Sequence, residues 1–253
     1  MRLDIALVKG GVFDSRQKAS EAIKAGFVRI DNTTITKPAF IVDKDLDLSS
    51  CLALAQDSGY VSRAAFKLKG FLEDLGVGRD FGRGKVAVDI GASRGGFSQI
   101  LLEFGFARVV CVDVGSNQLH SKLKSHPRVE AFENCDVREF AKRYSEEYIT
   151  RSAQAKPFDL LVCDVSFIGL EKIFDSLEVL SDEMILLYKP QFEVGAQAKR
   201  NKKGVLKEPN LIEKHLTDFR EMLAQRGFCI RHSAKSHIKG KQGNAEFFVH
   251  IQK

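Results

Sequence analysis

The stretch Lys85-Val86-Ala87-Val88-Asp89-Ile90-Gly91-Ala92-Ser93-Arg94-Gly95-Gly96-Phe97 decides the fold of this chain. Its apolar, β-branched first part predicts a buried strand, the glycines predict a tight loop, and the residues that follow, as far as Glu103, predict a helix. Glycines let the backbone approach a ligand closely and expose amide N–H groups at the start of a helix. We therefore expect a ligand on this loop.

A second apolar strand, predicted at residues 109–114, contains an acid at a position that suits a ribose contact. Asp113 follows Gly91 by 22 residues, and a carboxylate at this place accepts hydrogen bonds from ribose hydroxyls. Strand, glycine loop, helix, strand and acid form one nucleoside-binding unit. Ser93 stands where the dinucleotide fingerprint G-x-G-x-x-G has its second glycine. The unit is therefore more similar to the S-adenosylmethionine site of methyltransferases than to an NAD site.

Two other interpretations of the glycine loop stay open at this point. Residues 91–95 also match the G-x-S-x-G nucleophile elbow of serine hydrolases, which requires a later acid and a later histidine. Histidines near the end of the chain satisfy that order, but the chain has no His-Gly pair for an oxyanion hole, and hydrolase chemistry does not explain Asp113. The other alternative is a glycine turn with a purely structural role, because short strand-to-helix loops often contain glycine.

Length and composition limit the class of protein. A chain of 253 residues can form one large α/β domain and a small module. Five cysteines without C-x-x-C pairing predict reduced, buried thiols in a cytoplasmic protein. We expect no membrane association, because no signal peptide opens the chain and no apolar run approaches the length of a membrane span. The net charge of +6 fits a polyanionic partner.

The first 42 residues form a small basic module. A helix is predicted from Ser15 to Gly26, because serine favours the position before a helix and glycine favours its end. Two short strands at 27–30 and 33–36 flank the pair Asp31-Asn32, which favours a hairpin turn. The residues from Leu3 to Val8 form a short apolar segment, for which we predict no particular secondary structure.

This module resembles the S4-type RNA-binding module, first recognised in a ribosomal protein. The resemblance rests on Arg2-Leu3-Asp4, Ser15-Arg16, Ala19, Ile23, Gly26 and Val28-Arg29-Ile30-Asp31. In such modules a basic face contacts the phosphates of structured RNA without reading its sequence. The RNA-contacting residues that the resemblance implies are Arg2, Arg16, Lys18 and Lys24. A polar connection follows, and we place the domain boundary there: residues 1–58 for the module and its linker, and 59–253 for the second domain.

The second domain alternates helices with strands. A helix capped by Ser62 carries Lys67, and a short helix is predicted at 117–123. Further strands are predicted at 129–133, 158–164, 184–190, 228–233 and 245–251. Asp136 follows the first of these and is a candidate for the adenine amino group, although it would equally well cap the next helix.

A basic loop follows the predicted strand at 184–190. Residues 195–207 contain several lysines and an arginine but no acid. Such a run is often only a solvated surface, but beside a strand-end site it suits nucleic-acid phosphates. The residues that we expect to contact RNA in this loop are Lys199, Arg200, Lys202 and Lys203.

Four side chains at or near strand ends complete a family pattern. Lys67, Asp164, Lys189 and Glu246 resemble the K-D-K-E tetrad of the FtsJ-type 2′-O-ribose methyltransferases. The entry helix Ser62-Arg63-Ala64-Ala65-Phe66-Lys67-Leu68 resembles the same family, and Asp164-Val165-Ser166-Phe167 with Lys189-Pro190-Gln191-Phe192-Glu193 resembles its TlyA branch, also labelled haemolysin A. That branch joins an S4-type module to an FtsJ-type domain, in the order seen in this chain.

The resemblance implies a Rossmann-like class I S-adenosylmethionine methyltransferase fold, of class α/β, behind a small α+β RNA-binding domain. It also implies 2′-O-methylation of cytidine ribose in ribosomal RNA. Lys67 would be the general base, Asp164 would orient Lys67 and face the methyl group, Lys189 would hold the ribose, and Glu246 would fix the lysines. S-adenosylmethionine would contact Asp89, Gly91, Ser93, Gly95, Gly96, Phe97, Asp113, Val114, Asp136, Val137 and Asp164.

Some features separate this chain from its nearest alternatives. Its ends match the shorter form of the family, which acts on the large-subunit RNA only, whereas the longer form acts on both ribosomal RNAs. Arg94 replaces the threonine that we expect in the family loop. A non-catalytic RNA-binding protein would need a broken tetrad or cofactor loop, and neither is visible in the sequence. A membrane-lysing protein would need a spanning segment or an amphipathic basic helix, and the sequence indicates neither. We expect that the protein needs no metal, because no residues have metal-ligand spacing. We also expect it to be a monomer.

Overall fold

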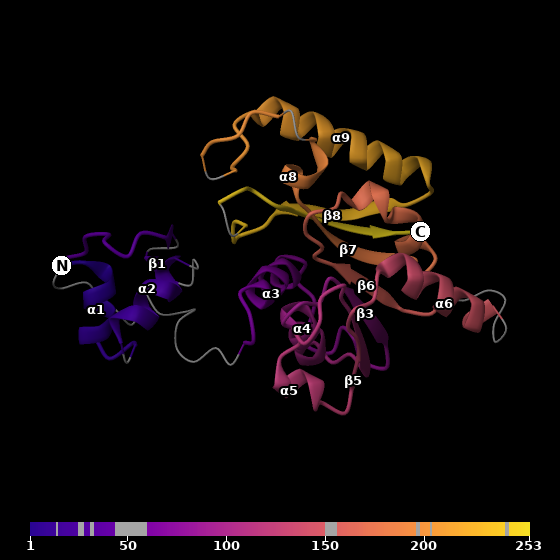
Figure 1. Ribbon diagram of the computed structural model, residues 1–253, viewed down its shortest axis with the longest axis horizontal. Helices are drawn as coiled ribbons and strands as arrows, with labels where there is room; N and C mark the ends of the chain where they lie inside the picture. The colour runs from indigo at the N-terminus through magenta and orange to yellow at the C-terminus, as the bar shows by residue number, and fades with distance from the viewer. Residues whose placement is uncertain are drawn as a thin grey trace. The chain divides into compact units, whose positions relative to one another are not determined.

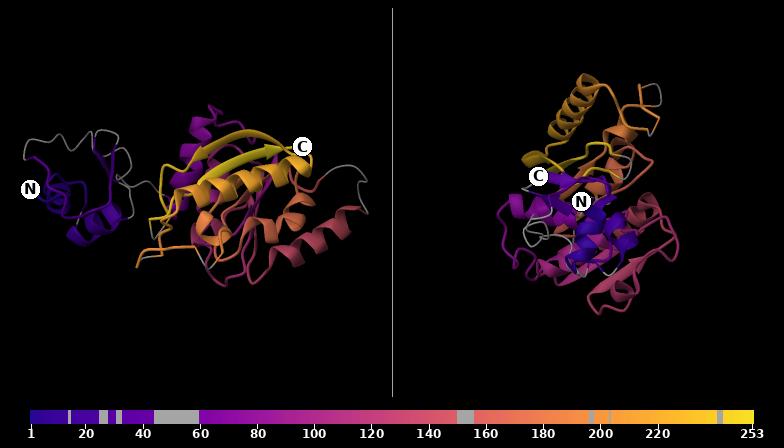
Figure 2. Two further views of the ribbon diagram at one scale, coloured as in Figure 1. Left: turned by 90° about the horizontal axis from the view of Figure 1, so that it is seen from above. Right: turned by 90° about the vertical axis from the view of Figure 1, so that its left-hand side faces the viewer.

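The computed structural model of the chain describes residues 1–13, 15–24, 28–30, 33–43, 60–149, 156–195, 198–202, 204–240 and 243–253. The chain divides into two compact units, Met1–Tyr60 and Val61–Lys253, which Figure 1 and Figure 2 draw as ribbons. Among the described residues, one buried apolar cluster lies in the smaller unit and another lies on one face of the sheet in the larger unit, and these two clusters share no residue. Each unit therefore has a hydrophobic core of its own.

The smaller unit contains two helices and a hairpin. Its elements are α1 (Leu3–Lys9), α2 (Arg16–Lys24) and the antiparallel strands β1 (Val28–Ile30) and β2 (Thr33–Ile35). The predicted helix and the two strands are confirmed. Helix α1 was not predicted, since the sequence analysis identified its residues only as an apolar segment. The predicted turn and Gly26 lie outside the described residues. The buried core consists mainly of Leu3, Leu7, Ala19, Ile23, Val28 and Ile35.

The larger unit is built on a seven-stranded sheet. Its strands are β3 (Val86–Ile90), β4 (Arg108–Val112), β5 (Val129–Phe132), β6 (Leu160–Cys163), β7 (Glu183–Tyr188), β8 (Cys229–Lys235) and β9 (Phe247–Gln252). They lie in the order β5-β4-β3-β6-β7-β9-β8. Strand β9 is antiparallel to both of its neighbours, β7 and β8, and all other neighbouring strands are parallel. The predicted Rossmann-like α/β fold is confirmed.

Helices cover both faces of this sheet. Helices α6 (Val137–Ile149), α7 (Phe174–Glu178) and α9 (Pro209–Gln225) bury apolar residues in one core with the strands. Helices α3 (Ala64–Asp74) and α4 (Gly96–Glu103) lie together on the other face (Figure 1). The ring of Phe248 in β9 lies 4.6 Å from the ring of Phe71 in α3 and 6.0 Å from that of Phe97 in α4. Figure 2 shows α9 alongside β8 and β9.

The carboxyl ends of β3 and β6 mark the point where the strand order reverses. From β3 the chain continues to β4 on one side, and it returns as β6 on the other. Open α/β sheets bind ligands at such a point. The residues that follow the ends of β3, β4, β6 and β7 are Gly91, Asp113, Asp164 and Lys189.

The helix predicted at 117–123 is shorter than expected. Helix α5 spans Ser121–Lys124, because His120 has an extended backbone and its side chain caps the helix by accepting the amide hydrogen of Lys122. Asn117, where the helix was expected to begin, has a left-handed backbone with φ of +52°. The amides of Gln118 and Leu119 donate to the Glu133 carboxylate at 2.6 and 3.1 Å instead of joining a helix. A left-handed residue cannot continue a right-handed helix.

The prediction that Ser62 caps α3 is wrong. Arg63 occupies the cap position and no side chain caps the helix. A Cβ on Gly96 would lie 2.2 Å from the Ser62 hydroxyl, so Ser62 packs against the start of α4. The last strand also begins later than predicted, and Glu246 immediately precedes β9. Two further short helices, η2 (Leu170–Lys172) and α8 (Pro190–Glu193), connect the strands.

Candidate active site

Two adjoining cavities lie over the carboxyl ends of the strands in the larger unit. The first, of about 340 Å³, is lined by residues at the ends of β3, β4 and β5, and we call it the β3–β5 cavity. The second, of about 400 Å³, contains Lys67 and Lys189, and we call it the lysine cavity. The two linings share residues, so the cavities are contiguous. The shared residues are Gly91, Ser93, Asp164 and Ser166.

Asp113 holds the glycine loop in place. One carboxylate oxygen accepts the amide hydrogen of Ser93 at 2.8 Å, and the other accepts that of Gly115 at 2.7 Å. Gly91 has φ of +80°, and a Cβ there would lie 3.0 Å from the carbonyl oxygen of Asp164. A side chain at position 91 would therefore be strained and crowded. The loop brings Asp113, Gly91 and Ser93 to the wall of the β3–β5 cavity.

Gly95 and Gly96 serve packing in this structure. A Cβ on Gly95 would lie 2.1 Å from a methyl carbon of Leu123, and one on Gly96 would lie 2.8 Å from the amide nitrogen of Ala65. Neither glycine lines either cavity. They allow α4 to begin against α5 and α3, which fixes the loop that does line the cavities.

Asp89 is a buried carboxyl group beneath the same loop. One oxygen accepts hydrogen bonds from the amide and the hydroxyl of Ser98 at 2.9 and 2.6 Å. The other oxygen has no hydrogen-bond partner among the described residues. Burial raises the pKa of Asp89 to about 7. Asp89 and the buried ring of Phe97 line the lysine cavity.

Asp136 lines the far end of the β3–β5 cavity together with Val114 and Val137. It accepts the amide hydrogen of Arg138 at 2.8 Å and so caps α6, and it also pairs with the Arg138 guanidinium. That pairing lowers the pKa of the Asp136 carboxyl group. The capping role and the cavity position are therefore both present.

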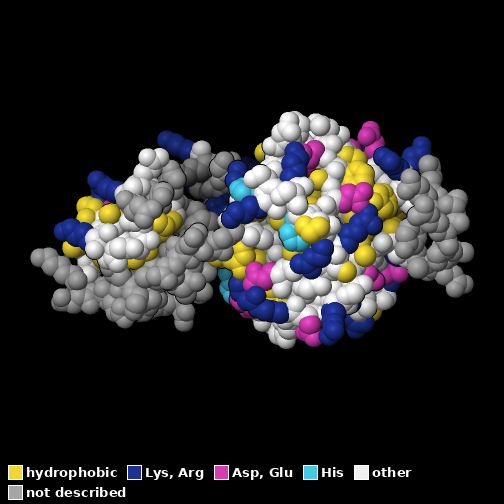
Figure 3. Space-filling view, turned by 90° about the horizontal axis from the view of Figure 1, so that it is seen from below, with side chains coloured by type: hydrophobic (Ala, Val, Ile, Leu, Met, Phe, Trp, Pro, Cys, Tyr) yellow, Lys and Arg dark blue, Asp and Glu magenta, His cyan; other side chains and the backbone are white. Residues whose placement is uncertain are grey.

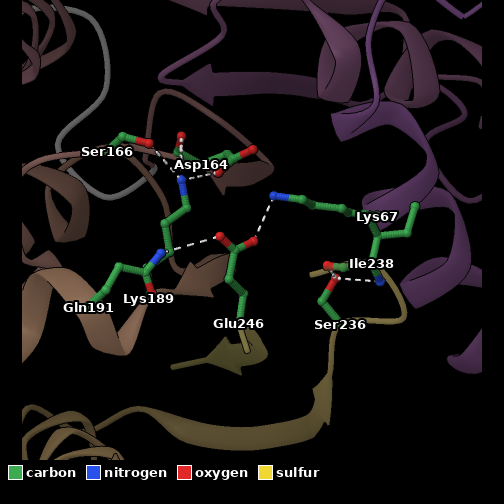
Figure 4. Close-up of polar contacts among 8 residues, drawn as sticks. All are labelled: Lys67, Asp164, Ser166, Lys189, Gln191, Ser236, Ile238 and Glu246. Carbon is green, nitrogen blue, oxygen red and sulfur yellow. Dashed lines mark hydrogen bonds and ion pairs between the residues drawn. The ribbon is translucent and has the colours of Figure 1, made fainter. Parts of the chain in front are cut away.

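The four tetrad residues meet in the lysine cavity (Figure 4). The Lys67 ammonium lies 2.6 Å from an oxygen of Glu246, and the Lys189 ammonium lies 2.5 Å from an oxygen of Asp164. Both lysines and Glu246 are buried. Buried charges persist only when they are paired. The cavity therefore contains two closed ion pairs, contributed by α3, by the residues after β6 and β7, and by the residue before β9.

This pairing differs in one respect from the roles expected for the tetrad. We expected Asp164 to orient Lys67, but Asp164 contacts Lys189 and Lys67 contacts Glu246. Gly240 makes the second contact possible, since a Cβ there would lie 2.4 Å from an oxygen of Glu246. Each lysine is thus held by its own carboxylate.

Ser166, Gln191 and Phe167 were not among the site residues predicted from the sequence. The Lys189 ammonium donates to the Ser166 hydroxyl at 2.9 Å, and the Gln191 amide donates to Glu246 at 3.4 Å (Figure 4). Phe167 is 91% exposed and has φ of +70° at the rim of the β3–β5 cavity. Ser166 and Gln191 lie inside the motifs that signalled the family, so their positions could have indicated a role.

Two arginines also line the lysine cavity, Arg63 before α3 and Arg94 before α4. Arg94 is exposed, and its Nε donates to the carbonyl oxygen of Val61 at 3.1 Å. The amide of Val61 in turn donates to the Gln99 side chain at 2.7 Å. The residue that departs from the family loop therefore lies at the lysine cavity and fixes the start of this unit.

The predicted RNA-contacting residues of the smaller unit fall into two groups. Arg2 and Arg16 are partly exposed, and both pair with Asp4. Lys18 and Lys24 belong to α2, but their side chains lie outside the described part of the structure.

The basic loop of the larger unit is partly self-contained. Lys199 and Lys202 are exposed, whereas Lys203 lies outside the described residues. The Arg200 guanidinium donates to the carbonyl oxygens of Gln191 and Gly195, each at 3.0 Å. Arg200 therefore fastens the loop to the end of α8.

The surface and the residue clusters give further limits. On the face drawn in Figure 3, Lys and Arg side chains of the larger unit are interspersed with Asp and Glu side chains, so its positive charge is spread out there. The described residues contain no group of three or more His, Cys, Asp or Glu that could hold a metal ion. No helix among them is long and apolar enough to cross a membrane.

Comparisons with known families match both units. The FtsJ-like methyltransferase family model matches residues 60–253, and the S4 domain model matches residues 1–48. The chain is 42% identical to the 23S rRNA (cytidine-2′-O)-methyltransferase TlyA of Campylobacter jejuni, over 93% of this chain and 86% of that protein. It is 34% identical to the 16S/23S rRNA (cytidine-2′-O)-methyltransferase TlyA of Mycobacterium tuberculosis, over 99% and 89%. It is also 34% identical to Hemolysin A of Brachyspira hyodysenteriae, over 99% of each chain.

Two solved structures are also similar to this chain in fold and in sequence. A hemolysin candidate from Streptococcus thermophilus is similar over 100% of this chain and 88% of its own, with a TM-score of 0.68 and 29% identity. A second hemolysin candidate, from Lactococcus lactis, covers 77% of this chain and 88% of its own, with a TM-score of 0.66 and 32% identity.

Proposed function

The chain belongs to the FtsJ-like methyltransferase family, in its TlyA branch, and from this premise we propose that it methylates the 2′-hydroxyl of a cytidine in large-subunit ribosomal RNA. The observation that carries the proposal is the pair of buried ion pairs, Lys67 with Glu246 and Lys189 with Asp164. They lie in a cavity contiguous with the one under the glycine loop.

The β3–β5 cavity fits S-adenosylmethionine. Its lining combines a carboxylate at the end of β4, a second carboxylate at the start of α6 and apolar side chains between them. Asp113 would hold the ribose hydroxyls and Asp136 the adenine amino group, with Val114 and Val137 against the ring. Gly91 and Ser93, which line both cavities, would contact the amino acid part of the cofactor where it extends toward the lysine cavity. The cofactor supplies a methyl group that its sulfonium charge already activates.

The lysine cavity can hold and deprotonate a ribose. A hydroxyl group is a weak nucleophile, so it must be oriented and must lose its proton as the new C–O bond forms. Lys67 acts as the base only after its ammonium group has released a proton to solvent; the neutral amine then takes the proton of the 2′-hydroxyl, and Glu246 stabilises the ammonium group that forms again. Lys189, fixed by Asp164 and Ser166, donates to a ribose oxygen and holds the sugar.

Ribosomal RNA as the substrate implies that the protein acts in the cytoplasm. The Campylobacter relative, at 42% identity, is named for 23S rRNA alone, which supports the large subunit as the target.

The direct test uses the purified chain, radiolabelled S-adenosylmethionine and each ribosomal subunit from an unmodified strain. Nuclease-resistant 2′-O-methyl dinucleotides then locate the label. We expect label in the large-subunit RNA only. Label in both RNAs would support the wider specificity for which the Mycobacterium relative is named. Absence of label from both RNAs would contradict the proposal.

A further inference from the structure

Asp4 in the smaller unit binds two arginines at once. Both of its oxygens accept hydrogen bonds from Arg2, each at 3.0 Å, and one of them also accepts from Nε of Arg16 at 3.0 Å. Asp4 lies in α1 and Arg16 is the first residue of α2. One carboxylate therefore fixes two guanidinium groups from different parts of the chain.

The carboxylate and the guanidinium groups differ in exposure. The Asp4 side chain is 2% exposed, whereas those of Arg2 and Arg16 are 41% and 58% exposed. A guanidinium has five N–H donors, and Asp4 takes two from Arg2 and one from Arg16. The two positive charges exceed the single negative one. A buried anion thus holds the exposed pair in place without cancelling its charge.

The backbone around this cluster is fixed as well. The amide of Asp4 donates to the carbonyl oxygen of Pro38 at 3.1 Å, and Arg2 forms a β-bridge with Ile41. The pairing with Arg2 and Arg16 also holds the pKa of the Asp4 carboxyl group below its usual value. The position of Asp4 is therefore set by the fold, and the arginines take their positions from Asp4.

We propose that Asp4 is a positioning residue that holds Arg2 and Arg16 together as a clamp for one phosphodiester group of the ribosomal RNA. The inference rests on the proposed function, which supplies the RNA. Guanidinium groups bind phosphate oxygens in pairs of parallel hydrogen bonds, and prior ordering reduces the entropy lost on binding. Such a contact positions the RNA and does not read its sequence.

The substitution Asp4→Asn separates the clamp from general electrostatic attraction by the sign of its effect. The variant has one more positive charge, so attraction alone predicts tighter RNA binding and a steeper salt dependence. The clamp predicts the opposite. We expect binding roughly 5- to 10-fold weaker, and a salt slope smaller by about one unit, as for the loss of one phosphate contact. The substitution Asp43→Asn, at an exposed position of the same unit, is the matched control and should not weaken binding.

A second variant keeps the charge constant. Arg16→Lys retains the positive charge but loses the planar fork, so attraction alone predicts unchanged binding while the clamp predicts a loss similar to that of Asp4→Asn. This variant also serves if Asp4→Asn proves too unstable to study. Thermal unfolding of each full-length variant sets the temperature at which all of them are folded.

The readout is retention of large-subunit rRNA on filters over a series of KCl concentrations, with methyl transfer measured in parallel. Weaker binding by Asp4→Asn and Arg16→Lys, with higher KM for RNA and unchanged kcat, would support the clamp. Binding equal to or tighter than that of the unaltered protein would overturn it. Because binding is scored without catalysis, absence of methyl transfer by the unaltered protein would contradict the proposed function and leave the test of the clamp intact.

Discussion

At the scale of single residues, Lys67 is the side chain on which the proposed chemistry depends most. The change Lys67→Ala removes the proton acceptor but no part of the β3–β5 cavity lining. We expect methyl transfer to fall by roughly 10²- to 10⁴-fold, the usual contribution of a general base, with cofactor affinity changed by less than about twofold. Calorimetric titration and methyl transfer assays measure the two effects.

Lys69 offers a matched control on the same helix. It pairs with Glu73 one turn further on, at the surface, so Lys69→Ala should leave activity near that of the unaltered protein. Full activity in Lys67→Ala would contradict the catalytic assignment.

Asp89 gives a prediction about pH. Burial raises its pKa to about 7 from the ordinary value of 3.8. The folded state therefore keeps a proton that the unfolded state releases, and the contribution of Asp89 to stability falls as the pH rises from about 4 to about 7. The variant Asp89→Asn has no such titration. We therefore expect the stability of the variant relative to the unaltered protein, measured as the difference in free energy of unfolding, to be greater at pH 8 than at pH 5 by roughly 2–3 kcal/mol.

Urea denaturation at the two pH values tests this prediction. The change Asp182→Asn, at an exposed position, controls for the loss of one negative charge. The same difference in stability at both pH values would show that Asp89 does not titrate in this range.

The sequence predicted that the four tetrad residues lie together, which the structure shows, but it did not predict how they pair. Lys67, Asp164 and Lys189 lie in motifs of a few residues, which a reader of the sequence can recognise. Their partners depend on where the residue before β9 meets the sheet, and on the space left at Gly240. These are contacts between segments far apart in the chain, and no local pattern encodes them. Ser166 lies inside a recognisable motif, but its contact with Lys189 became visible only in the structure.

At the scale of elements, the start of α4 should tolerate no side chain at Gly95. This residue has φ of +87°, and a Cβ would lie 2.1 Å from a methyl carbon of Leu123. Gly95→Ala therefore combines backbone strain with overpacking, and we expect a loss of roughly 2–4 kcal/mol in the free energy of unfolding.

Gly76 isolates the first of these two effects. It has φ of +67°, and a Cβ there would have no neighbour within 4 Å. Gly76→Ala should thus cost only about 1 kcal/mol, from backbone strain alone. Urea denaturation of both variants measures the difference, and equal losses would contradict the packing argument.

Strands were easier to predict than helix limits. The residues of β6 are all buried, because a central parallel strand is covered on both faces, and such continuous apolar runs stand out in the sequence. Helix starts depend on single backbone angles and side-chain contacts. Before α5, Glu133 takes the amides of Gln118 and Leu119, and His120 caps the helix; the apolar period of the helix shows neither contact.

At the scale of the whole molecule, the order of the units could be predicted, but the order of the sheet only in part. The alternation of strands and helices indicates a doubly wound sheet. The last two strands were predicted, but not their place in the sheet. That β9 inserts antiparallel between β7 and β8 depends on packing at the far edge of the sheet, where Phe248 contacts α3 and α4.

The separate cores of the two units lead to the last prediction. Because the apolar cluster of the smaller unit shares no residue with that of the larger one, residues 60–253 should fold and bind S-adenosylmethionine without the smaller unit. Loss of the smaller unit, with the arginine clamp and its other basic residues, should raise the KM for ribosomal RNA by roughly tenfold or more, since several phosphate contacts are removed. Calorimetry measures cofactor affinity, and methyl transfer over a range of RNA concentrations gives KM and kcat. Unchanged KM would contradict a role of the smaller unit in RNA binding, and loss of cofactor binding by the folded fragment would show that the larger unit requires residues before Tyr60.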